Sequence, residues 1–101
     1  FVEPFIQGYY VLGKNEKAQS LTKELLSIYL DRLRYYASLD AEESYIRIEE
    51  IYRDLEASRR VIDLSTEAND TEFIKPYTEE FNAQLEQLIA VLEASGDYLV
   101  N

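Results

Sequence analysis

Adjacent acidic residues are the side chains of this sequence that come nearest to a catalytic or metal-binding pattern. The pairs are Glu42 with Glu43, Glu49 with Glu50, and Glu79 with Glu80. Carboxylates on facing helices bind paired metal ions, but such sites also take a histidine three residues after a glutamate. The sequence contains no His and no Cys, so the commonest zinc ligands, the usual general base and the thiol nucleophile are missing. We therefore expect no metal, no cofactor and no catalytic residues in this chain.

Two weaker chemical patterns lead to the same expectation. Residues 63–72 are rich in acids, but they lack the glycine that a Ca²⁺-binding loop needs at its sharp turn. Ser58 stands beside Arg59 on the surface of a predicted helix, without the partner base that a serine hydrolase needs. No glycine-rich phosphate loop is present either. We predict that this domain is not an enzyme.

The nine tyrosines are the abundant residue type that could form a binding surface. Tyr combines an apolar ring with a polar hydroxyl and is enriched at interfaces. One interpretation places most of them at the edge of the core with their hydroxyls in water. The other is a binding groove near the end of the molecule that has no net charge, formed by Tyr9, Tyr10, Tyr35 and Tyr36. We take this groove as the candidate site, because concave surfaces of helical repeats commonly bind peptides.

The formal net charge of −10 is concentrated in the second part of the chain. Residues 1–40 hold five basic and five acidic side chains, whereas residues 41–101 hold five basic and fifteen acidic ones. This negative potential would repel nucleic acid and anionic lipid. It either keeps the protein soluble or favours a basic partner. No apolar run approaches the ~18 residues of a transmembrane helix, so the domain itself is not expected to span a membrane.

Apolar residues recur at helical spacing along the chain, which predicts an all-α fold. Pro4 suits the first turn of a short helix over residues 4–12, and Gly13 suits the left-handed position that ends it. Asn15 is then expected to cap a second helix over residues 16–39. Loops of a few residues favour antiparallel neighbours, so these two helices should form a hairpin.

A third helix is expected over residues 41–66, because Asp40 and Glu43 have the spacing of a capping box. Asp54 and its charged neighbours are assigned to the solvated side. The predicted buried face consists of Tyr45, Ile48, Ile51, Tyr52, Leu55 and Ile62. A fourth helix follows the next polar break and is expected to end at Gly96. Its predicted inward residues are Phe73, Ile74, Tyr77, Phe81, Leu85, Leu88, Ile89 and Leu92.

The first hairpin has a recognisable pattern. Tyr9 precedes the turn, Gly13 makes it, and the small Ala18 lies in the first turn of the next helix. This pattern resembles the helix–turn–helix of a tetratricopeptide repeat over about residues 5–28. No Pro closes the second helix and no second copy follows at the period of about 34 residues. We therefore expect one domain over residues 1–101 with about four helices, a tetratricopeptide-repeat-like hairpin followed by two long helices.

A wider resemblance covers about residues 5–65. Residues 9–18, Tyr29 with Leu30, and residues 33–39 are similar to the C-terminal soluble region of a bacterial multi-pass membrane protein family that resembles protein O-mannosyltransferases. The resemblance implies that the chain is a fragment of a longer protein, held on the periplasmic side of the inner membrane. The catalytic acids of such enzymes belong to the membrane part, so none is carried over to this sequence.

The expected function is a non-catalytic protein-interaction or scaffolding domain that binds a protein or peptide and no nucleic acid. The family resemblance implies that this domain is the extracytoplasmic appendage of a membrane glycosyltransferase-like protein. One alternative is a cytoplasmic acidic adaptor or chaperone-like helical bundle. Another is an acceptor- or glycan-binding surface that assists glycosyl transfer. The sequence leaves these alternatives open.

Overall fold

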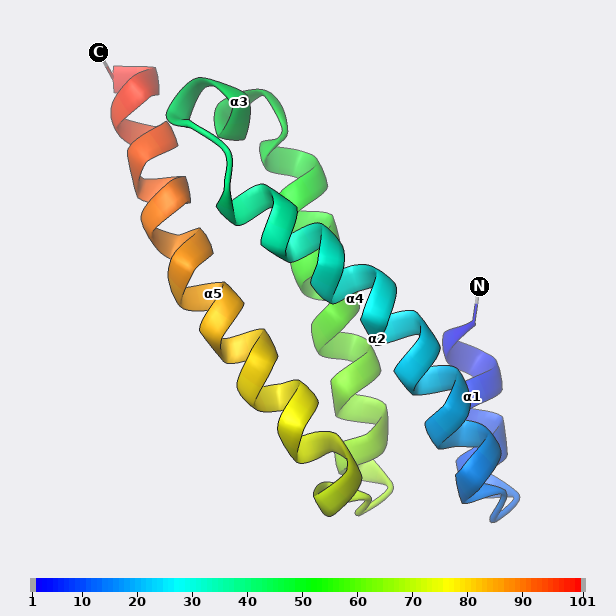
Figure 1. Ribbon diagram of the computed structural model, residues 1–101. Helices are drawn as coiled ribbons and strands as arrows, with labels where there is room; N and C mark the ends of the chain where they lie inside the picture. Colours follow the sequence, from blue (N-terminus) through cyan, green and yellow to red (C-terminus); the bar gives the residue numbers. More distant parts are fainter. Residues whose placement is uncertain (1, 101) are drawn as a thin grey trace.

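The protein is an elongated bundle of α-helices, 53 × 24 × 18 Å, as seen in a computed structural model (Figure 1). The structure describes residues 2–100, apart from the side chains of residues 95 and 97–100. The helices within this range are α1 (Glu3–Val11), α2 (Asn15–Ala37), α3 (Ala41–Ile46), α4 (Ile48–Glu67) and α5 (Thr71–Val100). The described residues contain no strand, which confirms the predicted all-α fold. Helices α2, α4 and α5 form a three-helix bundle, and α1 packs beside α2.

The first turn forms as its sequence predicts. Gly13 has a φ of 74°, which an L-residue with a Cβ adopts only at a cost. The backbone N–H of Lys14 donates to the carbonyl of Tyr9 (2.8 Å), and that of Gly13 donates to Tyr10 (3.0 Å). This is the Schellman arrangement, which satisfies the last carbonyls of α1. The predicted capping role of Asn15 is wrong by one position, because α2 already begins at Asn15 and Lys14 precedes it without a side-chain cap.

The third predicted helix is in fact two helices. Asp40 caps the first as expected, its Oδ1 accepting from the N–H of Glu43 (2.9 Å), but α3 ends at Ile46. Arg47, with φ −101° and ψ 14°, redirects the chain before α4 begins. Helix α5 has 30 residues and α2 has 23, so α5 is longer by roughly 10 Å. The part of α5 that extends beyond the end of α2 therefore needs another element to pack against it. The break lets α3 turn across and pack on that part of α5 (Figure 1).

The buried face of α4 agrees with the predicted one at Ile48, Ile51, Leu55 and Ile62, which are buried or half-buried, and differs from it elsewhere. Tyr52 is 56% exposed, and Asp54, which was expected in solvent, is only 4% exposed. The buried positions include the small residues Ala57, Ser58 and Ser65. Small side chains let neighbouring helices approach closely, so α4 turns this stripe inward and leaves Tyr52 outside. Tyr45 and Ile89 also lie exposed rather than inward. The other predicted inward residues of α5 are buried or half-buried.

The core joins all of the long helices. Its buried apolar members are Ile6, Ala18, Leu26, Leu30, Leu33, Tyr36, Ile51, Val61, Ile62, Ile74, Phe81 and Leu88. At the other end of α4, Asn69 takes the left-handed φ of 62° that Gly13 takes after α1. The prediction that Gly96 ends the last helix is wrong, because α5 continues to Val100. One Gly costs about 1 kcal/mol relative to Ala and does not stop a helix of this length.

Candidate functional site

A groove lies between α1 and α4, which run in the same direction (Figure 1) and make few contacts with each other. It consists of two adjoining depressions of about 330 and 250 Å³, and a third of about 240 Å³ adjoins them where Leu25 and Tyr29 of α2 form the wall. The first two share Gln7, Leu64 and Glu67, and the first and third share Glu3 and Arg60. We call it the α1–α4 groove. Its lining in the two larger depressions is Glu3, Pro4, Gln7, Tyr10, Val11, Asn15, Arg60, Asp63, Leu64, Glu67 and Ala68.

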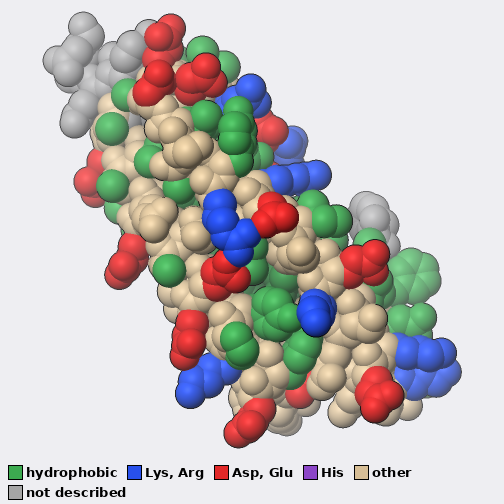
Figure 2. Space-filling model, viewed as in Figure 1, with side chains coloured by type: hydrophobic (Ala, Val, Ile, Leu, Met, Phe, Trp, Pro, Cys, Tyr) green, Lys and Arg blue, Asp and Glu red, His purple; other side chains and the backbone are tan. Residues whose placement is uncertain are grey.

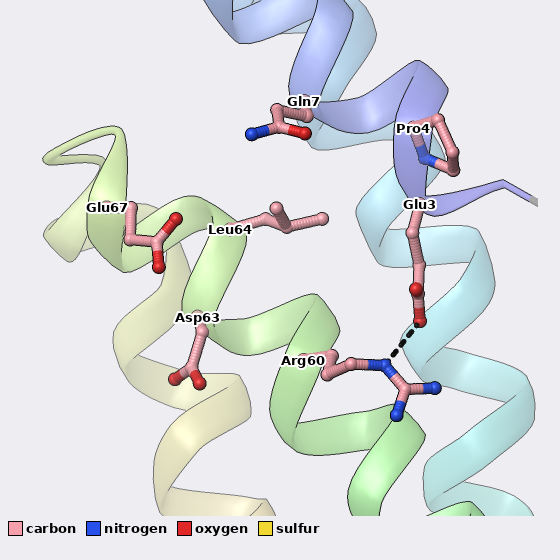
Figure 3. A pocket seen from close by; sticks show the side chains of 7 residues that line it. All are labelled: Glu3, Pro4, Gln7, Arg60, Asp63, Leu64 and Glu67. Carbon is pink, nitrogen blue, oxygen red and sulfur yellow. Dashed lines mark hydrogen bonds and ion pairs between the residues drawn. The ribbon is translucent and has the colours of Figure 1, made fainter.

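One end of the groove is bridged by an ion pair. Arg60 Nε lies 3.4 Å from Glu3 Oε1, which ties the start of α1 to the middle of α4 (Figure 3). Arg60 Nη1 also lies 3.1 Å from Glu56 Oε1. The only basic side chain in the lining of the first depression is therefore held between two carboxylates.

The other end is bridged by a polar network. The hydroxyl of Tyr10 donates to Asp70 Oδ2 (2.9 Å), and Ser65 Oγ lies 2.9 Å from the same hydroxyl. Gln19 donates to the same oxygen of Asp70 (2.8 Å), so α1, α2, α4 and the start of α5 meet here. Burial raises the pKa of Tyr10, and the nearby Asp70 raises it further. Tyr10 thus stays a neutral donor, and Ser65, which is fully buried, is out of reach of a substrate.

Between the two bridges the groove combines an apolar strip with an acidic wall. Leu64 extends from α4 towards Pro4 on α1 (Figure 3), and Val11, 79% exposed, lies towards the turn. Asp63 and Glu67 flank Leu64 on α4 and are exposed. Neither makes a hydrogen bond or ion pair with any residue that the structure describes. Sequence reasoning missed this site, although two like charges in the last turns of a helix were a readable signal.

The four tyrosines predicted to form a groove lie in two separate places. The ring of Tyr9 lies 5.9 Å from Nζ of Lys17, and Tyr10 borders the α1–α4 groove. Tyr35 follows Lys17 by 18 positions along α2, which is roughly 27 Å. The structure therefore does not bring Tyr9 and Tyr10 together with Tyr35 and Tyr36. Binding at either pair stays a prediction.

Tyr35 and Tyr36 differ in their surroundings. Tyr35 is half exposed, and the guanidinium of Arg47 lies 5.9 Å from its ring. Tyr36 is buried, and its hydroxyl donates to Asp54 Oδ2 at 2.6 Å. Burial, together with the hydrogen bond and the charge of Asp54, holds the pKa of Tyr36 far above its usual value. Tyr36 therefore belongs to the core, and Tyr35 is the member of this pair that is open to solvent.

The other chemical candidates are structural. Ser58 is fully buried instead of lying on a helix surface, and its Oγ donates to the carbonyl of Asp54 (2.7 Å). Residues 63–67 are helical, so they form no calcium loop. Among the described residues, no group of three carboxylates is placed to hold a metal ion.

Comparisons with known proteins add no assignment. The chain matches no family model, no curated protein and no solved structure. In the part of the chain that the structure describes, no helix combines the length and the apolar character needed to cross a membrane.

Proposed function

We propose that this chain is a protein-interaction domain that binds a peptide segment in the α1–α4 groove. The observation that carries the proposal is the open apolar strip of Pro4, Leu64 and Val11 between two bridged ends. Exposed apolar side chains that gather in a groove mark a binding site, and Val11 is among the most exposed apolar residues of the molecule. In the view of Figure 2, further hydrophobic side chains reach the surface near α1.

The size of the groove limits the occupant. Helix α1 has nine residues and spans roughly 13 Å. An extended peptide covers that length with about four residues, and a helix covers it with about nine. Such a contact suits a short linear segment that docks reversibly, rather than the large face of a permanent subunit interface.

The place of the domain in the cell rests on sequence resemblance alone. We propose that it is the extracytoplasmic appendage of a membrane glycosyltransferase-like protein, where it would hold a partner or an acceptor protein near the membrane. Protease protection of the full-length protein in cells and spheroplasts tests this. Cleavage of the domain once only the outer barrier is opened supports the appendage. Protection in spheroplasts would favour the cytoplasmic adaptor instead.

Binding in the groove is tested with peptides selected from a random, phage-displayed 12-residue library. Leu64→Ser should weaken a selected peptide by roughly tenfold or more, because it removes an apolar anchor of about 1.5–3 kcal/mol. Ile28→Ser is the matched control, since Ile28 is 49% exposed on α2 and lines none of the depressions that form the groove. Equal affinity of the Leu64 variant and the native chain would refute the groove as the binding site, provided that circular dichroism shows both to be folded.

A further inference from the structure

The acidic side chains of this protein are mostly placed where they stabilise its own helices. Glu3, Glu16 and Glu72 lie in the first turns of α1, α2 and α5, where the positive end of the helix dipole attracts a carboxylate. The same holds for the first turns of α3 and α4. Other acids pair with arginines, as Glu80 pairs with Arg34.

Asp63 and Glu67 are the exception within the groove. Glu67 is the last residue of α4, where the helix dipole is negative and a cation would be favoured, and the last turn of α4 holds no basic residue. The two carboxylates are also four residues apart on one helix face, a spacing at which like charges repel. Neither carboxylate forms an ion pair with a Lys or Arg in the described part of the chain. Folding therefore draws no stability from this pair.

The rest of the lining cannot neutralise them. Arg60 is already held by Glu3 and Glu56. On the α1 wall, the first depression presents Glu3, Pro4 and Gln7, none of which is basic. In Figure 3, Leu64 extends toward α1, whereas Glu67 lies on the other side of Leu64 and the carboxylate of Asp63 points along α4, away from α1. All three side chains line the first depression. An incoming cation would thus meet a negative wall directly beside an apolar side chain.

Resting on the proposed function, we infer that the α1–α4 groove takes a basic segment of a partner protein, in which a Lys or Arg sits between Asp63 and Glu67. One helical turn separates the two carboxylates by roughly 6 Å along the axis, a distance that one guanidinium or ammonium group bridges. The aliphatic stem of the same side chain lies along Leu64 and keeps its charged end in water. A neighbouring apolar residue of the partner occupies the strip of Pro4 and Val11.

The experiment uses peptides selected from the random 12-residue library on the native chain, synthesised and titrated by isothermal calorimetry. The selected peptides should be enriched in Lys and Arg next to Leu, Ile or Phe. Asp63→Asn with Glu67→Gln should weaken binding at least tenfold and leave the helical circular dichroism unchanged. Raising NaCl from about 50 mM to about 500 mM should weaken binding to the native chain much more than to this variant.

The matched control is Glu86→Gln with Glu93→Gln, which changes the net charge equally on the exposed side of α5 and should leave affinity within twofold. Equal weakening by both double variants would overturn the inference, because it would show general attraction to an acidic protein. Peptides without basic residues that still lose affinity on Leu64→Ser would overturn the inference and leave the proposed function standing. Selection of no peptide at all, or of peptides indifferent to both sets of changes, would overturn both.

Discussion

The hydroxyl of Tyr36 donates a 2.6 Å hydrogen bond to Asp54 Oδ2 at a point where both side chains are almost fully buried. Arg32 also approaches this carboxylate, with its Nη1 3.7 Å from Asp54 Oδ1. A buried carboxylate needs such partners, because an unpaired one is strongly penalised. This relationship between α2 and α4 is the basis of the first two predictions.

Tyr36→Phe should destabilise the protein by about 1–3 kcal/mol, since it removes the donor and leaves a buried carboxylate undersatisfied. Urea unfolding followed by circular dichroism measures the change. Tyr35→Phe is the control, because Tyr35 is half exposed and should change stability by less than about 0.5 kcal/mol. Equal effects of the two substitutions would contradict the role assigned to Tyr36.

Stability should also fall in alkaline solution. The pKa of Tyr36 is raised in the folded protein by burial and by Asp54, and the pKa of Tyr10 is raised mainly by burial. A raised folded pKa means that the stabilisation is complete below the unfolded pKa of about 10 and is lost as the pH rises above it. Thermal unfolding between about pH 8 and pH 11 should show this decline. In Tyr36→Phe the decline should be shallower, and an unchanged slope would argue against Tyr36 as its source.

Tyr10→Phe should loosen the α1 wall of the groove. The substitution removes the donor to Asp70 and leaves the buried Ser65 without that partner, at a cost of about 1–2 kcal/mol. Amide hydrogen exchange should accelerate in α1 more than in α5, because the lost bonds tie α1 to α4. Uniform acceleration across the whole chain would instead indicate global destabilisation.

Two acids on α4 should have opposite effects on stability. Glu67→Gln should stabilise the protein by about 0.3–1 kcal/mol, because it removes a negative charge from the C-terminal end of the helix and from beside Asp63. Glu49→Gln should destabilise it by a similar amount, since Glu49 lies in the first turn of the same helix. Both are read from urea unfolding at low ionic strength. Effects of the same sign would contradict this account.

Two glycines should likewise respond in opposite directions to Ala. Gly13→Ala should cost about 1–2 kcal/mol, because it forces a residue with a Cβ into a φ of 74°. Gly8 lies inside α1, where a Cβ would meet no atom within 4 Å. Gly8→Ala should therefore stabilise the protein by about 0.5–1 kcal/mol. Thermal unfolding should show a lower midpoint for Gly13→Ala and a higher midpoint for Gly8→Ala than for the native chain. Shifts in the same direction would contradict this account.

The sequence correctly predicted the features whose interactions span only a few residues. The left-handed turn at Gly13 and the cap from Asp40 to Glu43 each close within one helical turn, so the sequence around them is sufficient. The helical period of the apolar residues acts at the same short range and predicts the all-α fold. By itself, the sequence also determined the acidity of the chain and its lack of His and Cys.

Only the tertiary structure decided the features that depend on distant partners. Arg47 breaks a helix whose period continues through it, because α3 gains a surface on α5 that a straight helix would not reach. Asp54 is buried because Tyr36, 18 positions earlier, supplies its donor. The α1–α4 groove forms between segments more than 50 residues apart, which are held by the Glu3–Arg60 and Tyr10–Asp70 contacts. Such contacts depend on how the helices pack around one core, and no local pattern of residue types encodes that arrangement.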